Sequence, residues 1–223
     1  MSRPSFRIAF FVPALALIAW GCSLGPNFVA KEEPWRDTEE RACIASGVVR
    51  ESSFLRSRSA LGGPSVCGAA RPFEMAAADG GRVTFEPPAL LRCPMIPQVD
   101  RWVREVVEPT ALRYYGLRVA SMKIAASYAC RPMNNVSGGR LSEHGHANAL
   151  DVSAFILADG TRITVKQGWY GSERDRAFLR GVRNGACSGF TTVLGPDHDF
   201  NHHDHFHVDL ARHGRDGQNR ICK

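Results

Sequence analysis

Six cysteines are spread along the chain after its first segment, and they constrain the fold more than any other feature. They are Cys43, Cys67, Cys93, Cys130, Cys187 and Cys222. Their even number favours disulfide pairing in an oxidising compartment. No two of them form a C-x-x-C pair, which argues against a zinc finger or a thioredoxin-like motif. The sequence therefore predicts a cross-linked domain but leaves the pairing open, and scattered thiols in a cytosolic protein are the alternative.

The N-terminus has the pattern of an export signal. Arg3 and Arg7 precede an apolar run over residues 8–20, which is too short to span a bilayer comfortably. Cys22 follows Gly21 where a bacterial lipoprotein carries its lipidated cysteine, although Ala19 stands where leucine is usual. We expect a secretion or lipoprotein signal over 1–22, with an uncleaved anchor as the alternative. The expected location is the periplasm or cell envelope, with attachment to the membrane through the N-terminus.

The rest of the chain reads as a tether followed by one domain. Residues 23–41 are polar and charged and contain Pro26 and Pro34, which predicts a tether before a domain over 42–223. The content of 44% hydrophobic and 22% charged residues is typical of a globular protein. The net charge of +6 comes from scattered residues and not from a basic block, so we expect no nucleic-acid site. We expect a monomer.

Hydrophobic periodicity predicts an α+β fold, a small and largely antiparallel sheet flanked by helices. Residues 43–81 show little periodicity and are expected to be irregular and stapled by Cys43 and Cys67. Helices are expected over 99–107, ending or kinking near Pro109, and over 172–184, where Ser172 and Asp175 resemble a capping box. Strands are expected over 82–85, 121–128, 149–156, 162–166, 190–194 and 205–210.

Five of the eight histidines lie between His198 and His207. His205 and His207 are two residues apart on an expected strand, so their rings should project from the same face. One ring could then hold a metal while the other stands over a bound water. Asp204 should face the opposite way, against the core. A solvated histidine loop is the alternative reading of this cluster.

A second stretch narrows the choice of ligands. His144 and Asp151 are seven residues apart, so a turn through 145–148 must bring them together. Asp151 lies in an otherwise apolar strand, where a carboxylate is costly to bury unless it is paired or binds a cation. A salt-bridged core aspartate is the alternative. Nitrogen and oxygen ligands without a thiolate suit zinc.

These residues carry a resemblance to a known superfamily. The stretch SEHGHANALD over 142–151 resembles the first metal motif of the lysostaphin, D-alanyl-D-alanine peptidase and hedgehog superfamily, and HFH over 205–207 resembles the second. Within it, the segments SYACR, SEHGHANALDV, VLGP and HHDHFHVDL are most similar to the bacterial extensin-like C-terminal domain family, over about 43–223. The resemblance implies the fold of that superfamily and zinc bound by His144, Asp151 and His207.

The resemblance also implies roles for the neighbours of the ligands. His205 would steer or deprotonate the metal-bound water, with Asp204 as an alternative base. Arg131 would neutralise the oxyanion, unless it only closes a surface ion pair, and Ser142 would support the loop or contact substrate. One departure is Ala147, which stands where the carboxypeptidases have glycine. Three further histidines are expected to be supporting or exposed groups: His146, His202 and His203.

The function implied is that of an exported zinc-dependent peptidase, an amidohydrolase acting on peptidoglycan cross-links or stem peptides. Endopeptidase and carboxypeptidase action, on D,D or L,D bonds, both remain open. The alternative is a non-catalytic, metal-containing protein that binds the cell wall or has a structural role in the envelope, because such a site can persist without turnover.

Overall fold

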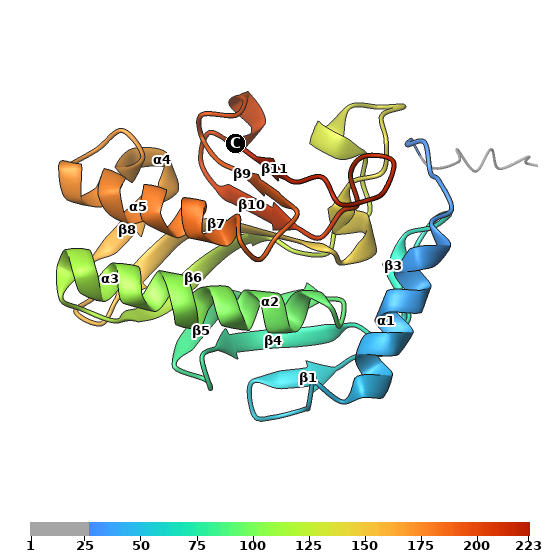
Figure 1. Cartoon of the computed structure of the whole chain (residues 1–223), viewed down its shortest axis with the longest axis horizontal. Coiled ribbons are helices and arrows are strands. Elements are labelled where there is room, and N and C mark those ends of the chain that lie inside the picture. Colours follow the sequence, from blue (N-terminus) through green and yellow to red (C-terminus); the bar gives the residue numbers. More distant parts are fainter. Residues whose placement is uncertain (1–26) are drawn as a thin grey trace, which may run out of the picture.

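The computed structural model describes residues 27–223, and the expected signal over 1–22, with Cys22, lies outside the described residues. One large mixed sheet dominates the fold (Figure 1). Its nine strands follow the order β1-β4-β5-β6-β7-β10-β9-β11, with β8 paired to β7. Their bounds are β1 Leu55–Ser57, β4 Phe73–Ala78, β5 Val83–Leu91, β6 Val119–Ala126, β7 Ala149–Leu157, β8 Arg162–Thr164, β9 Thr192–Leu194, β10 Phe206–Asp209 and β11 Ile221–Cys222.

The mixture of helices and strands is confirmed, but the prediction of a small sheet is wrong. Most pairings are antiparallel, while β5–β6 and β9–β11 are parallel. The sheet is larger than expected because the segment before residue 82 contributes β1 and β4, and the C-terminus contributes β11. Strand β4 reads FEMAAA, which lacks β-branched residues and a clear polar alternation, so its sequence gave little strand signal. Strands β2 (Leu61–Gly62) and β3 (Gly68–Ala69) form a separate pair.

The expected helix around Val99 is longer than its apolar pattern indicated. Helix α2 (Met95–Trp102) continues through a π-helical turn, η1 (Val103–Val107), into α3 (Glu108–Tyr115). Pro109 lies in the first turn of α3. Proline lacks an N–H and crowds the carbonyl four residues earlier, and the wider π turn before it accommodates both effects. The chain therefore neither ends nor breaks its helical course at Pro109.

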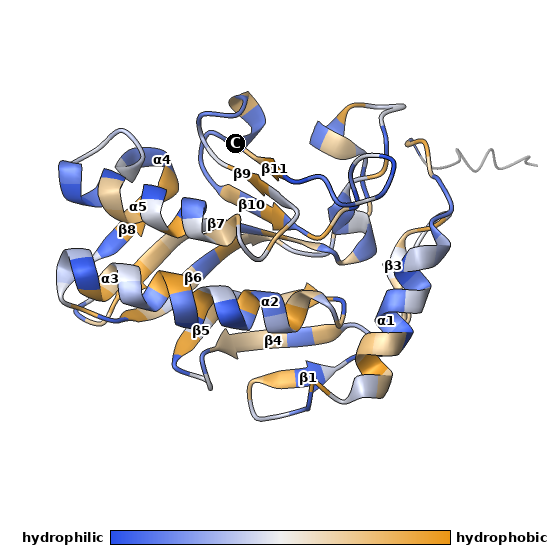
Figure 2. Cartoon of the chain, in the orientation of Figure 1, coloured by the Kyte–Doolittle hydropathy of each residue, from blue (hydrophilic) through white to orange (hydrophobic). Residues whose placement is uncertain are grey.

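Helix α5 (Glu173–Ala186) packs beside this run and matches its expected position (Figure 1). The Ser172 hydroxyl accepts a hydrogen bond from the Asp175 amide at 3.1 Å, as its capping pattern predicted. Trp102 Nε1 donates to the Val182 carbonyl at 3.1 Å, which joins the two helical segments. Apolar residues are concentrated on the central strands, and the segment between β10 and β11 is largely hydrophilic (Figure 2). A short helix, α4 (Val165–Gly168), follows β8.

The segment expected as a tether differs from the structure in its second half. Helix α1 (Pro34–Ser46) begins inside it, and both Arg36 and Glu40 are buried. The Glu40 carboxylate accepts hydrogen bonds from the amides of Ala70 and Arg71, 3.2 and 3.1 Å away. The charged, proline-containing sequence suits a tether, but two of its charges, Arg36 and Glu40, are paired with groups of the domain. Among the described residues, no helix is long and apolar enough to cross a membrane.

The six cysteines form three disulfides, as predicted. They pair Cys43 with Cys93, Cys67 with Cys130 and Cys187 with Cys222. Cys43 and Cys67 therefore each staple their segment to a distant one and not to each other. These bonds fix α1 to the chain before α2, the β2–β3 loop to the chain before Arg131, and the end of α5 to β11. Three disulfides indicate an oxidising, exported environment.

Candidate metal centre

Strands β7 and β10 bring the first two expected ligands together. In their antiparallel register, His207 lies opposite Asp151. Side chains alternate along β10, so Phe206 and Val208 join the core while His207 and Asp209 line a cavity on the other face of the sheet. His207 Nδ1 lies 2.9 Å from Asp151 Oδ1. Both residues are buried, so neither charge is satisfied by solvent.

The third expected ligand comes from a short 3-10 turn before β7. This turn, η3 (Glu143–His146), is capped by the Ser142 hydroxyl, which accepts from the His144 amide at 3.4 Å. Ala147 then turns the chain into β7 with φ of +51°, in the left-handed region that favours glycine. The turn brings His144 Nε2 to 3.1 Å from Asp151 Oδ2.

The hydrogen-bond pattern around His144 tests whether a cation fits. The Nδ1 of His144 donates to the Ser127 carbonyl at 2.5 Å, because a carbonyl only accepts. In the neutral ring, Nε2 then carries a lone pair, is fully buried and has no hydrogen-bond partner within residues 27–223. Facing a carboxylate oxygen, this lone pair requires either a second proton or a metal ion between the two atoms. The residues therefore fit a divalent cation.

His207 leads to the same conclusion. Its Nε2 donates to Asp209 Oδ2 at 2.9 Å, so its Nδ1 faces Asp151 either with a second proton or as a free ligand atom. Burial opposes ionisation of His207, but the hydrogen bonds to Asp151 and Asp209 outweigh it and raise its pKa to about 10. Burial would raise the pKa of Asp151, yet its contacts with His144 and His207 hold that pKa well below its usual value.

Asp209 is a functional residue that the sequence reasoning missed. Its carboxylate is buried, holds the Nε2 of His207 and accepts a second hydrogen bond from the Ala211 amide at 2.9 Å. A carboxylate behind a metal-ligating histidine fixes the tautomer and the direction of the ring. The alternation of side chains along a strand could have identified it, because Asp209 is two residues beyond His207 on the same strand and so shares its face.

His205 and Asp204 are arranged differently from the expectation. Strand β10 begins at Phe206, so His205 precedes it, yet His205 Nε2 still lies 3.6 Å from Asp151 Oδ2. The prediction that Asp204 faces the core is wrong, because its side chain is 44% exposed and accepts from His205 Nδ1 at 2.9 Å. The end of the strand removes the alternation on which that prediction rested. Asp204 orients His205 and leaves Nε2 of that ring free toward the cavity.

The cavity around these residues has a volume of about 530 Å³. Arg131, Arg140 and Ser142 line it together with the expected ligands. The Arg131 guanidinium reaches the Pro132 carbonyl at 3.4 Å and takes part in no ion pair within the described part of the chain. Among the described residues, Arg131 therefore has no carboxylate with which to form the surface ion pair that was its alternative role. The cavity is large enough for several residues of a peptide, with positive charge on one wall.

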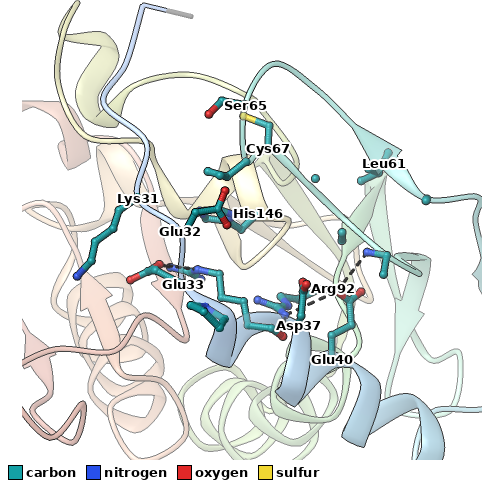
Figure 3. A pocket seen from close by; sticks show the side chains of 17 residues that line it. Lys31, Glu32, Glu33, Asp37, Glu40, Leu61, Ser65, Cys67, Arg92 and His146 are labelled. Carbon is teal, nitrogen blue, oxygen red and sulfur yellow. Dashed lines mark hydrogen bonds and ion pairs between the residues drawn. The ribbon is translucent and has the colours of Figure 1, made fainter.

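Three further histidines lie near the candidate ligands: His202 and His203 before β10, and His146 in η3. His202 is buried and lines the cavity, and His203 is partly exposed and stacks on Phe200, with ring centroids 4.9 Å apart. His146 is buried but lines a separate cavity of about 320 Å³ behind η3, between α1 and the β2–β3 segment (Figure 3). Burial and the nearby Arg36 guanidinium lower the pKa of His146 to about 4, so it is neutral.

An ion-pair network behind η3 supports the loop that carries His144. The Arg36 guanidinium donates to both Glu143 oxygens, at 2.7 and 2.5 Å. Glu143 also accepts from Asn148 Nδ2 at 2.6 Å, which closes the loop between η3 and β7. Glu40 and Arg92 lie on the wall of the same cavity as His146, 3.6 Å apart (Figure 3). Helix α1 thus contributes to the position of His144.

Comparison with known proteins gives one match. The sequence model of a family described as extensin-like protein C-terminus matches residues 41–223. The matched region includes every expected ligand, all six paired cysteines and the second half of α1. No curated protein and no solved structure matches the chain.

Proposed function

Because this chain belongs to the extensin-like C-terminal family, and its matched region holds His144, Asp151 and His207 together, we propose that it is an exported zinc-dependent peptidase. The proposed substrate is the peptide part of peptidoglycan, in cross-links or stems. The two metal motifs support a place for the family within the lysostaphin, D-alanyl-D-alanine peptidase and hedgehog superfamily. The three disulfides support action in the periplasm or envelope, and lipid attachment through Cys22 is part of the same proposal.

The single observation that carries the proposal is the pair of histidine nitrogens facing one buried carboxylate. His144 Nε2 and His207 Nδ1 lie 3.1 and 2.9 Å from the two oxygens of Asp151. Two nitrogens and one oxygen, all buried at the wall of a cavity, match the three-residue donor set of a catalytic zinc site. A core salt bridge would need a second proton on both buried histidine rings around one carboxylate, whereas one divalent cation satisfies both nitrogens and the carboxylate together.

The surrounding residues would perform the proton chemistry of amide hydrolysis. When bound, zinc lowers the pKa of a coordinated water to about 7. His205, held through Nδ1 by Asp204, presents Nε2 as the group that accepts a proton in the cavity and passes it to the leaving amine. Arg131 adds a positive charge on the cavity wall, where it would favour the negative oxygen that develops on the scissile carbonyl.

The experiment uses the full chain with its disulfides formed, incubated with peptidoglycan fragments. Cleavage of a peptide bond that a chelator abolishes and zinc restores supports the proposal. His205→Ala should abolish cleavage while zinc stays bound, and His203→Ala, a neighbouring histidine outside the site, should leave cleavage unchanged. If zinc binds but no peptide bond is cleaved, and His205→Ala leaves wall binding unchanged, the chain is a metal-containing wall-binding protein. Mass spectrometry of the products locates the cleaved bond, and its position distinguishes endopeptidase from carboxypeptidase action.

A further inference from the structure

A second group of metal-ligand side chains lies on the wall of the same cavity. We propose that His198, Asp199 and His202 form a second, weaker site for a zinc-like divalent cation. One ligand atom from each residue lies within 4.8 Å of those of the other two. Asp199 Oδ1 is 2.7 Å from His202 Nδ1, and Asp199 Oδ2 is 3.6 Å from His198 Nε2. The group has the donor chemistry of the first site but comes from a single loop.

The loop holds two of the three ligands in place. Asp199 caps the short 3-10 turn η4 (Phe200–His202), and its Oδ1 accepts from the amides of Asn201 and His202 at 2.8 and 3.2 Å. These bonds fix the carboxylate and return the His202 ring to the cavity, where it is buried. Asp199 Oδ2 makes none of these bonds and faces His198.

The spacing of the ligand atoms sets the expected strength of the site. Neighbouring ligand atoms around tetrahedral zinc are about 3.4 Å apart, given metal–ligand bonds of about 2.1 Å. The Asp199–His202 and Asp199–His198 distances, 2.7 and 3.6 Å, lie on either side of this value. Small shifts of the side chains would therefore bring the ligand atoms to the spacing of a zinc site, and the 28% exposed side chain of His198 has room to move. The exposure of His198 to water makes this site weaker than the buried first site.

The competing reading is that Asp199 only orients His202 through a hydrogen bond, as Asp204 orients His205. That reading gives His198 no part in the arrangement and predicts no second metal ion. The two readings differ at His198. Its backbone amide donates to the Gly195 carbonyl at 2.9 Å, and its imidazole takes no part in that hydrogen bond. Removing its imidazole therefore leaves the fold of the loop intact and tests the cation site directly.

A cation here would lie beside the first site. The His202 ring centroid is 5.3 Å from that of His205 and 5.8 Å from that of His207. A second ion with its waters would occupy part of the space that a peptide needs to reach His205. Excess zinc should therefore slow peptide cleavage, a consequence that rests on the proposed peptidase function.

The test is a zinc titration of the oxidised full chain against a competing chelator. We expect two zinc ions per chain, the second bound at least about tenfold more weakly. His198→Ala and His202→Ala should each lose the second ion and keep the first, while His203→Ala, in the same loop, keeps both. One zinc per wild-type chain, or a second zinc that persists in both His198→Ala and His202→Ala, would overturn the proposal.

Measurements of peptide cleavage provide a second, separate test. With His198→Ala, cleavage at excess zinc is compared with the cleavage of the same variant at one equivalent of zinc, and inhibition by excess zinc should disappear. Equal inhibition of His198→Ala and the wild type would overturn the regulatory consequence. Absence of cleavage at every zinc level would instead contradict the peptidase function, and the stoichiometry would still decide whether the second site exists.

Discussion

His207 and Asp209 are joined by a hydrogen bond of 2.9 Å on the cavity face of β10, which leaves His207 Nδ1 directed at Asp151. Asp209 thereby sets the direction of a ring that is expected to hold the metal. Since such a carboxylate fixes the tautomer, its loss should weaken zinc binding about 10- to 100-fold.

Asp209→Asn checks this role at nearly constant shape. The amide oxygen can still accept from the Ala211 amide, but the amide nitrogen then faces His207 Nε2 and cannot accept its N–H. We expect zinc affinity to fall by the factor given above while the metal-free protein stays folded, as measured by competition titration and thermal unfolding. Asp204→Asn is the matched control, since that carboxylate contacts His205 and should leave zinc affinity within about threefold. Equal losses in both variants would refute the assignment.

Asp204→Asn should instead lower peptide cleavage. Asp204 holds His205 through Nδ1, so an amide at this position weakens both the orientation of the ring and the basicity of Nε2. We expect kcat to fall about 10- to 100-fold with little change in KM and in bound zinc. Steady-state kinetics with a purified stem peptide measures this split. A change confined to KM would place Asp204 in substrate binding.

The pH dependence of stability should reverse when zinc is removed. The raised pKa of His207 stabilises the metal-free fold below about pH 6.5 and loses its effect as pH rises toward about 10, while the lowered pKa values of Asp151 and Asp209 stabilise it above about pH 4. We therefore expect the cluster to contribute most between about pH 4 and 6.5 without metal.

Zinc must displace the second proton of His207, so the stabilisation by zinc should grow from about pH 5 to pH 8. Thermal unfolding with and without chelator across this range measures both trends. A zinc-induced increase in Tm that stays constant over the range would show that His207 gives up no proton to the metal.

Arg36→Ala tests the support that α1 gives to the metal loop. Breaking a buried ion pair leaves Glu143 uncompensated and costs about 3 kcal/mol of unfolding free energy. Since Glu143 precedes His144, zinc affinity should also fall. Arg212→Ala removes an exposed ion pair with Glu39 on the same helix and should cost under about 1 kcal/mol with no change in zinc affinity. Equal effects on zinc binding in the two variants would remove α1 from the site.

The parts of the fold that could be predicted are those with a local signal. Strand β7 and helix α5 follow from apolar periodicity and a capping serine, and the disulfides follow from the even number of cysteines. Strand β4 and helix α1 could not be predicted, because β4 is alanine-rich and α1 is charged, with Arg36 and Glu40 buried. Their structure depends on partners far away in the sequence, such as Glu143 for Arg36.

In the candidate site, too, some residues could be predicted from local sequence patterns and others could not. The proximity of His144, Asp151 and His207 agrees with the geometry that the motifs implied. Strand parity gave the wrong side for Asp204, because the strand starts two residues later than that position. The same parity, extended beyond the motif, would have found Asp209. Where a strand begins depends on the strands beside it, so the direction of a side chain at a strand end does not follow from its own sequence alone.

His144, Asp151 and His207 are proposed to bind one zinc ion tightly between them. The most direct measurement is a competition titration with zinc on the oxidised wild type and on His144→Ala, Asp151→Ala and His207→Ala, with His203→Ala as the control. We predict one tight site in the wild type and the control, weakened at least about 100-fold in each of the three variants. Tight zinc binding that survives all three substitutions would show that these residues are not the zinc ligands.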